Sequence, residues 1–373
     1  MLVPSEELHL FAPIQKVLRV WFKTGWAGVT LFFVLSGYLI SSLIFNEFLN
    51  TGTVRFGRFY VRRGLKIYPA FYCMLACTLL LGYYDLHYFH RDLVPQEKLT
   101  SNIILSEVFF LQNYLGYIWV HVWSLAVEEH FYIGLGIVIS LMMTLYPRVR
   151  HGIVLRDRFT LMPWFCVSTF GLCLALRYLY VRSIPATLSA DAQMDLRYAG
   201  SCYTHLRIDS LLFGVFLAYF VKFRGEWFVP WVRRNTIGLL IAGLALISPS
   251  LIYEETSNFM LIPGFTMMYM GFGCLLLFTL YHPWKTKNKA LNRVSGALAY
   301  IGQNSYSVYL WHYPVMVILE KLLPKSTNYY LVIILQNIAG LATGLIMAKL
   351  IEMPVLKMRD KFFTPTKALN AGV

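Results

Sequence analysis

Long apolar runs, separated by short polar stretches, follow one another through most of the chain. A helix needs roughly 20 mostly apolar residues to cross the hydrocarbon layer of a bilayer. Nine runs come close to this length, at residues 26–45, 65–84, 123–146, 159–181, 206–221, 236–253, 261–281, 298–320 and 329–351. The pattern predicts an all-α, polytopic membrane bundle of about nine transmembrane helices.

A tenth apolar stretch, at residues 103–120, differs from these nine. Glu107, Gln112 and Asn113 interrupt it, and such side chains are costly in contact with lipid. We therefore expect a re-entrant or interfacial segment there rather than a full span.

The basic residues support this division of the chain. They gather in every second connection and in the C-terminal tail, at residues 55–66, 148–158, 222–234, 285–293 and 357–367, whereas the connections between carry few. In multi-pass proteins the basic loops remain in the cytoplasm. The pattern predicts a cytoplasmic C-terminus, and counting 103–120 as a span would destroy the alternation.

Nine spans with a cytoplasmic C-terminus leave residues 1–24 outside. This segment lacks the features of a signal peptide, and we expect an interfacial amphipathic helix at 14–22. A transmembrane domain at 25–356 and a cytoplasmic tail at 357–373 complete the predicted organisation. Lys16, Arg19 and Lys23 are unusual on the outer side, so a missing upstream segment stays an alternative.

Composition excludes an ordinary soluble protein. Of the 373 residues, 57% are hydrophobic and 14% are charged, whereas a soluble domain is about a quarter charged. The net charge of +14 is spread over short loops instead of one hydrophilic face, so no nucleic-acid partner is expected. Five of the six cysteines lie in apolar runs, as small buried hydrophobic residues do.

Ionisable residues inside spans are functional candidates by default. Glu128, Tyr132 and Leu135 lie close to one helical face at the outer end of the third span, so at least one carboxylate of the Glu128–Glu129 pair should point into the bundle. A second group, Arg207 and Asp209, opens the fifth span. For the first group the alternative is a solvated interface, and for the second it is a structural ion pair.

A third polar group lies in the eighth span. His312 sits inside an apolar run, with Ser305 and Tyr309 near its helical face. A satisfied core histidine is the alternative to catalysis there. Glu352 ends the last span, and Lys349 offers it a salt bridge.

Other ionisable residues are expected to be less informative. Arg177 can extend outward from the fourth span. Five histidines should lie on solvated surface, namely His87, His90, His121, His151 and His282. No set of His, Asp and Glu has metal-ligand spacing, so no metal is expected.

The connection after the first span carries a basic stripe. Arg58, Arg62 and Lys66 are spaced by four residues, so they line one helical face, with Arg63 beside them. Such a stripe can hold a phosphate-bearing ligand through charge-assisted hydrogen bonds. Anionic lipid headgroups are the other candidate ligand.

Read in order, these segments resemble the membrane acyltransferase 3 family, whose members O-acylate bacterial surface polysaccharides and related acceptors. The matching motifs are a glycine and FFVLSG signature at 25–40, a basic loop with an IYP sequence at 62–69, WSL–E–FY at 123–132, R-x-D at 207–209, SYxxYLxHYP at 305–314 and E-x-P at 352–354. Together they cover about residues 25–356.

The resemblance implies an O-acyltransferase of the bacterial plasma membrane. Cytoplasmic acyl-CoA, expected to be acetyl-CoA, would be the donor, with its phosphates facing Arg58, Arg62, Arg63 and Lys66. A hydroxyl of a carbohydrate or lipid-linked glycan would be the acceptor. A hydroxyl that attacks a thioester needs a base to take its proton, and the oxyanion of the tetrahedral intermediate needs a hydrogen-bond donor. Glu128 and His312 are placed nearest this chemistry.

The chain departs from the family at its start. Family members begin with another helix that carries an Arg and, about three turns on, a His with a role in acyl transfer. His9 is the sole histidine before the glycine motif and thus the candidate for this catalytic histidine, but no span precedes it. Two rival functions also remain, a secondary transporter and a truncated, inactive acyltransferase homologue.

Overall fold

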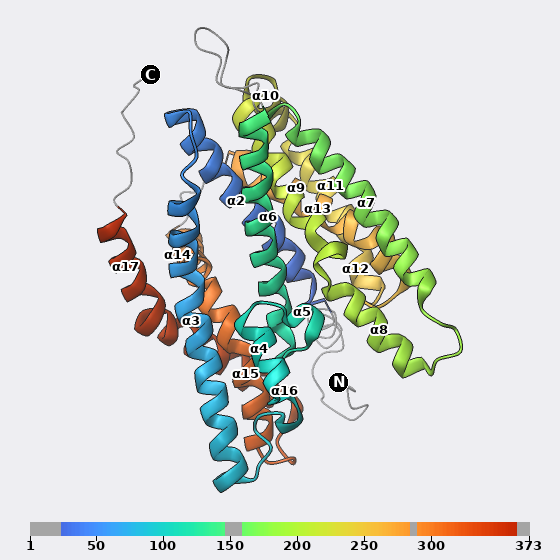
Figure 1. Ribbon diagram of the computed structural model, residues 1–373, viewed down its shortest axis with the longest axis vertical. Helices are drawn as coiled ribbons and strands as arrows, with labels where there is room; N and C mark the ends of the chain where they lie inside the picture. Colours follow the sequence, from blue (N-terminus) through green and yellow to red (C-terminus); the bar gives the residue numbers. More distant parts are fainter. Residues whose placement is uncertain (1–23, 146–158, 284–288, 364–373) are drawn as a thin grey trace. The chain divides into compact units, whose positions relative to one another are not determined.

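The computed structural model describes residues 24–145, 159–283 and 289–363 (Figure 1). In these ranges the regular elements are all helices, without strands, which confirms the predicted all-α class. The predicted interfacial helix at 14–22, His9, His151 and the tail beyond residue 363 lie outside the described residues.

Six helical segments are long and apolar enough to cross a membrane. They are Ala27–Thr51, Phe56–Phe89, Val120–Leu145, Met162–Ser183, Met260–Tyr281 and Tyr329–Phe362. A seventh results if Gly225–Arg234 and Thr236–Ile252, bent by 79°, form one broken span. This chain is therefore a multi-pass membrane protein.

The predicted count of nine spans is not reached within the described ranges. Two predicted spans, 206–221 and 298–320, are not among these candidate spans. Helices are present there, but polar residues are frequent in them. Helix α9 (Thr204–Phe223) begins with Arg207 and Asp209. Helix α15 (Ser305–Leu322) carries His312 and ends near Lys321, and Asn304 separates it from α14 (Lys289–Gln303).

The described chain forms two compact units. The first contains residues up to Val54 and Ser124–Pro283. Its helices are α2 (Ala27–Thr51), α6 (Trp123–Leu145), α7 (Met162–Ser183), α8 (Ala190–Cys202), α9, α10 (Gly225–Arg234), α11 (Thr236–Ile247), α12 (Pro249–Ile252) and α13 (Phe265–Tyr281). Helix α2 packs closely on α9.

Glycines permit the contact between α2 and α9. A Cβ atom added at Gly37 would overlap the backbone carbonyl of Leu211, and one at Gly214 would overlap the backbone of Val34 and Tyr38. Small residues let membrane helices approach to backbone contact. The glycine of the FFVLSG sequence therefore has a packing role that fixes the neighbouring Ser36.

The second unit contains Arg55–Trp123 and the residues after Pro283. Its helices are α3 (Phe56–Tyr84), α4 (Ser101–Val108), α5 (Gln112–Leu115), α14, α15, α16 (Tyr329–Met347) and α17 (Met353–Phe362). Helices α15 and α16 pack tightly, because a Cβ at Gly340 would lie 3.2 Å from the Cα of His312. This contact fixes the backbone that carries the histidine.

The stretch 103–120 forms no single long helix. It contains the short helices α4 and α5, joined by a turn in which Phe110 has a φ of 55°. The prediction that it is not a full span is confirmed, and its three polar residues are the reason: Glu107, Gln112 and Asn113 are all buried inside the protein.

Candidate active site

Glu128 lies at the centre of a buried polar cluster in the first unit. Its Oε1 accepts hydrogen bonds from the hydroxyls of Ser36 on α2 and Tyr132 on α6, and these two hydroxyls lie 2.8 Å apart. Glu128 and Tyr132 are each 1% exposed. The expectation that at least one carboxylate points into the bundle is confirmed, since Glu128 is buried.

This cluster joins α2 to α6. A buried carboxylate is tolerated when hydroxyl donors satisfy it. Because the hydroxyls of Ser36 and Tyr132 both donate to the same oxygen, the arrangement stabilises this helix pair and also holds Ser36 and Tyr132 in fixed orientations. The catalytic role predicted for Glu128 stays a prediction.

The second polar group of this unit centres on Asp209, which is fully buried. Asp209 pairs with Arg177 of α7, with an N–O distance of 2.8 Å. Arg177 also donates to the carbonyl of Leu206 at 3.0 Å and to the Thr266 hydroxyl at 2.7 Å. The expectation that Arg177 extends outward is wrong, since at 2% exposure it is enclosed by these acceptors.

Arg207 has other partners. It donates to the Thr30 hydroxyl at 2.9 Å, and its guanidinium lies 3.6 Å from the centre of the Phe265 ring. Burial raises the pKa of Glu255, in the loop before α13, while the charge of Arg207 opposes this. Arg207 therefore contacts residues of two other helices, α2 and α13, while Asp209 pairs with Arg177 of α7.

His312 belongs to an aromatic cluster in the second unit. The ring of His121 lies 5.4 Å from that of His312 and stacks on Tyr313 at 5.2 Å. The hydroxyl of Tyr309 donates to the backbone carbonyl of His121 at 2.6 Å. The prediction of a surface position for His121 is wrong, since its side chain is 8% exposed.

Backbone carbonyls determine the tautomers of both histidines. Nδ1 of His312 lies 2.6 Å from the carbonyl of Tyr309, and Nε2 of His121 lies 3.1 Å from that of Leu310. A carbonyl oxygen only accepts, so each of these nitrogens carries the proton in the neutral ring. His312 therefore has its lone pair on Nε2, the form that can act as a base.

The contact to Leu310 depends on Pro314. Within α15 the carbonyl of Leu310 would normally accept from the N–H four residues later, but proline has no N–H. This carbonyl is therefore available to His121. The Tyr-Pro part of the SYxxYLxHYP sequence thus explains how a segment distant in sequence docks beside His312.

The residues that interrupt the stretch 103–120 hold the segment before His121. Glu107 accepts from the backbone N–H of Ile118 at 2.7 Å, and Gln112 donates to the carbonyl of Val122 at 3.0 Å. Burial raises the pKa of Glu107 to about 7, and hydrogen bonds from Ile118 and Trp119 oppose this. These side chains position His121.

Ser305 and Glu352 occupy different surroundings. Ser305 is exposed at the first turn of α15. Ser307, two residues on, is fully buried and donates to Glu352 at 2.6 Å. Glu352 ends a π-helical turn, Ala348–Glu352, before α17. Glu352 therefore accepts a hydrogen bond from Ser307, whereas the sequence suggests a salt bridge with Lys349.

The basic stripe lies in the first turns of α3, as expected. Its four members, Arg58, Arg62, Arg63 and Lys66, are partly exposed. Arg62 donates to the carbonyl of Phe363 at 2.8 Å and lies 3.7 Å from Asp360, whereas Arg58 is 3.5 Å from the same carbonyl. The shared target shows that Arg58 and Arg62 lie on one face, but their ligand stays a prediction.

Several partners of the predicted residues carry little sequence signal. Ser307 and Thr30 are small polar residues within apolar helices. Ser36 and His121 differ, because Ser36 belongs to the FFVLSG sequence and His121 lies two residues before the WSL sequence, where the chain enters α6. That place beside a motif was a usable signal.

Comparisons with known proteins give the same family. A family model described as an acyltransferase domain matches residues 9–353. The chain belongs to this family of membrane acyltransferases. The match starts at His9, but the structure does not describe that residue, and its predicted role is untested.

Characterised relatives are similar at modest identity. The chain is 26% identical to the peptidoglycan O-acetyltransferase OatA of Listeria monocytogenes over 355 residues, which are 90% of this chain and 52% of that protein. It is 26% identical to the O-acetyltransferase OatA of Staphylococcus aureus over 366 residues, 92% of this chain and 54% of that protein.

A further Staphylococcus aureus protein, named as a candidate O-acetyltransferase, is 28% identical over 313 residues, 81% of this chain and 48% of that protein. The chain thus spans about half the length of the curated relatives it matches. No solved structure gives a significant match.

Proposed function

We propose that this protein is an integral membrane O-acetyltransferase of the bacterial plasma membrane, with its C-terminus in the cytoplasm. Acetyl-CoA on the cytoplasmic side is the donor, and a hydroxyl of a carbohydrate, such as a cell-wall glycan, is the acceptor. The family and the names of the relatives support the reaction. The alternating basic loops support the orientation.

One observation carries the proposal, namely the link between the basic stripe and His312. The hydroxyl of Tyr306 donates to the carbonyl of Ile67 at 2.8 Å, and Ile67 directly follows Lys66. His312 lies six residues further along α15, a rise of about 9 Å. The basic stripe and His312 therefore belong to the same compact unit, so an acetyl-CoA molecule held at the stripe would have its thioester on the side of His312.

In this mechanism Nε2 of His312 takes the proton of the acceptor hydroxyl. The hydroxyl oxygen attacks the thioester carbonyl, the new ester bond forms, and the CoA thiolate leaves. Nδ1–H of His312, bonded to the carbonyl of Tyr309, keeps the ring oriented for this step. Glu128 acts from the first unit as a positioning residue for Ser36 and Tyr132.

The donor is tested by binding. The purified full chain in nanodiscs should bind acetyl-CoA, and neutralising Arg58, Arg62 and Lys66 singly should each weaken binding by roughly 1.5–3 kcal/mol if a hydrogen bond to a charged group is lost. Arg234→Gln, in another basic loop, is the matched control. Unchanged affinity in the triple alanine variant would reject the donor site.

The reaction is tested in cells that lack their own envelope O-acetylation. Expression of the chain should add the mass of one acetyl group to an envelope glycan, removable by mild alkali as an ester is. The His312→Gln variant, present at equal amount in the membrane, should show no such product. Acetylation that persists with His312→Gln would exclude this histidine as the base.

A further inference from the structure

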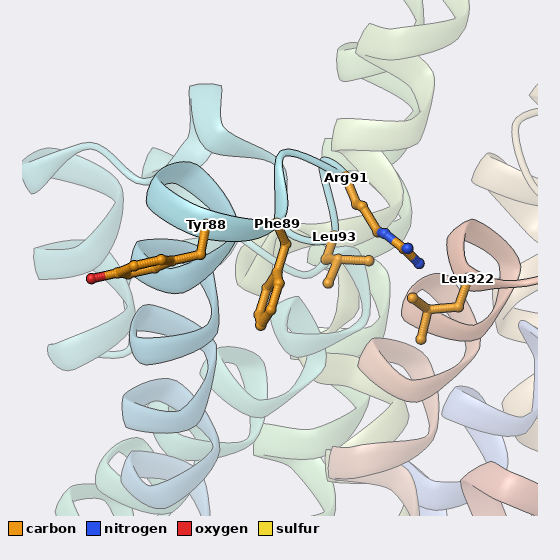
Figure 2. Close-up of a pocket in the computed structure, with 5 residues that line it drawn as sticks. All are labelled: Tyr88, Phe89, Arg91, Leu93 and Leu322. Atoms are coloured by element: carbon orange, nitrogen blue, oxygen red, sulfur yellow. The ribbon is translucent and has the colours of Figure 1, made fainter.

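A pocket of about 490 Å³ lies in the second unit, where α3 ends and α15 ends (Figure 2). Tyr88, Phe89, Arg91, Leu93 and Leu322 line it. Three of these side chains are aliphatic or phenyl groups, and Arg91 extends toward Leu322 across the opening. The lining therefore combines apolar walls with one cationic group.

The loop that presents Arg91 is held in an unusual backbone conformation. His90 and Asp92, on either side of it, have φ values of 51° and 53°, which L-residues other than glycine seldom adopt. The buried carboxylate of Asp85 accepts from the backbone N–H groups of Arg91 and Leu93 and so maintains the loop. Backbone of this kind persists where surrounding contacts enforce it.

A second contact attaches this loop to α15. Lys321 pairs with Asp92 at 2.6 Å, and Leu322 follows it directly in the wall of the pocket. Asp92 is therefore already neutralised by Lys321. The side chain of Arg91 is exposed, and its guanidinium makes no hydrogen bond or ion pair with the residues that the structure describes, 24–145, 159–283 and 289–363.

The position of the pocket determines which ligands can reach it. The candidate span that contains α3 ends at Phe89, so the pocket lies at the end of a helix long enough to cross a bilayer. Tyr88 and Phe89 in its lining are 67% and 53% exposed, and Tyr83, at the end of α3, is 55% exposed. Such aromatic rings are typical of the boundary between acyl chains and headgroups.

We propose that this pocket binds a membrane lipid whose phosphate is directly attached to an apolar chain, as in a prenyl phosphate. The guanidinium of Arg91 binds the phosphate, and Phe89, Leu93 and Leu322 contact the first carbons of the chain. Arginine suits phosphate because it offers paired N–H donors in a plane. The inference does not depend on the acetyl transfer proposed above.

The test measures binding to the full chain in detergent, without an acetyl donor. Three probes separate the contributions: geranylgeranyl phosphate, the uncharged geranylgeraniol, and inorganic phosphate. The lipid phosphate should bind at least roughly tenfold more tightly than either other probe, as the loss of a hydrogen bond to a charged group predicts. Equal binding of the alcohol, or of free phosphate, would overturn the proposal.

Variants then locate the site. Arg91→Gln should weaken geranylgeranyl phosphate roughly tenfold to a hundredfold and leave geranylgeraniol unchanged, whereas Leu322→Ser should weaken both lipids. Arg182→Gln, an exposed arginine at the end of α7, is the matched control. Equal thermal unfolding of all variants shows that folding is retained. Unchanged binding in the Arg91→Gln variant would place the lipid elsewhere.

Discussion

Two buried polar clusters look alike in the sequence but differ in the structure. Around Glu128, the hydroxyls of Ser36 and Tyr132 converge on one carboxylate oxygen. In the cluster around His312, Nδ1 of His312 and Nε2 of His121 each lie beside a backbone carbonyl, and the side chain of His312 is partly exposed. The first arrangement holds two helices together, whereas in the second we propose that Nε2 of His312 acts as the base.

The comparison teaches that a polar residue in a span has to be judged by its partners. A carboxylate that accepts two hydroxyl bonds at one oxygen is stabilised in its charged form, which makes it a weaker base toward a substrate proton. A histidine fixed through Nδ1 loses nothing when Nε2 takes a proton. The two clusters therefore predict different responses to substitution.

The largest effect is expected at His312. Gln at this position removes the base without altering the volume greatly, so turnover should fall by roughly 10²–10⁴, while the amount of folded protein in the membrane stays the same. Labelled acetyl transfer per folded molecule measures this. His282→Gln, a histidine outside the cluster, is the control, and a proportional loss of folded protein would make the role of His312 structural.

Breaking the buried ion pair should give the next largest effect, on stability alone. Arg177→Leu leaves Asp209 buried and charged, which costs about 3–5 kcal/mol. The double variant with Asp209→Asn should recover part of this loss. Thermal unfolding in detergent measures both. If the single variant were as stable as the wild type, the pair would not hold α7 to α9.

Glu107 links the second cluster to pH. Its folded pKa, about 7, lies above the usual value of 4.5 for a glutamate side chain. The folded state is therefore favoured fully below pH 4.5, and it loses stability between pH 4.5 and 7, by up to roughly 3 kcal/mol. Thermal unfolding should show this loss in the wild type but not in Glu107→Gln. Identical pH profiles would contradict burial of an ionisable carboxyl.

The smallest effect is expected at Glu128. Gln keeps an oxygen that accepts from Ser36 and Tyr132 but removes the charge, so stability should fall by about 1 kcal/mol. Turnover per folded molecule should change little, in contrast to His312→Gln. A large loss of turnover with normal stability would reverse the assignment and place the base in the first unit.

The hydrophobic pattern was sufficient to predict the helical class and the break at 103–120, because a segment that crosses lipid must satisfy its backbone hydrogen bonds within a helix. It also predicted that a carboxylate of the third span points into the bundle. The pattern did not predict which charged side chains pair between helices. Arg177 reaches Asp209 across 32 residues of sequence, and no local rule links the two. Among the described residues six or seven helices have the length and hydropathy of a span, and α9 and α15, where polar residues are frequent, are not among these.

The site was predicted in part for the same reason. His312 and the stripe at α3 are local patterns, and the structure brings them into one unit through Tyr306. His121 was misplaced because its burial depends on contacts with α15 that lie 189 residues away in the sequence. Ser307 was missed because the spacing argument selected Ser305, which faces outward.

Pro314 offers a rule for other chains in which a proline lies within a membrane helix. The carbonyl four residues earlier loses its helical donor, and in lipid that vacancy must be filled. A nearby histidine, arginine or tryptophan from another segment is the natural occupant. The residue four positions before such a proline is thus the place to expect a hydrogen bond from a distant side chain, as at Leu310, whose carbonyl accepts from His121.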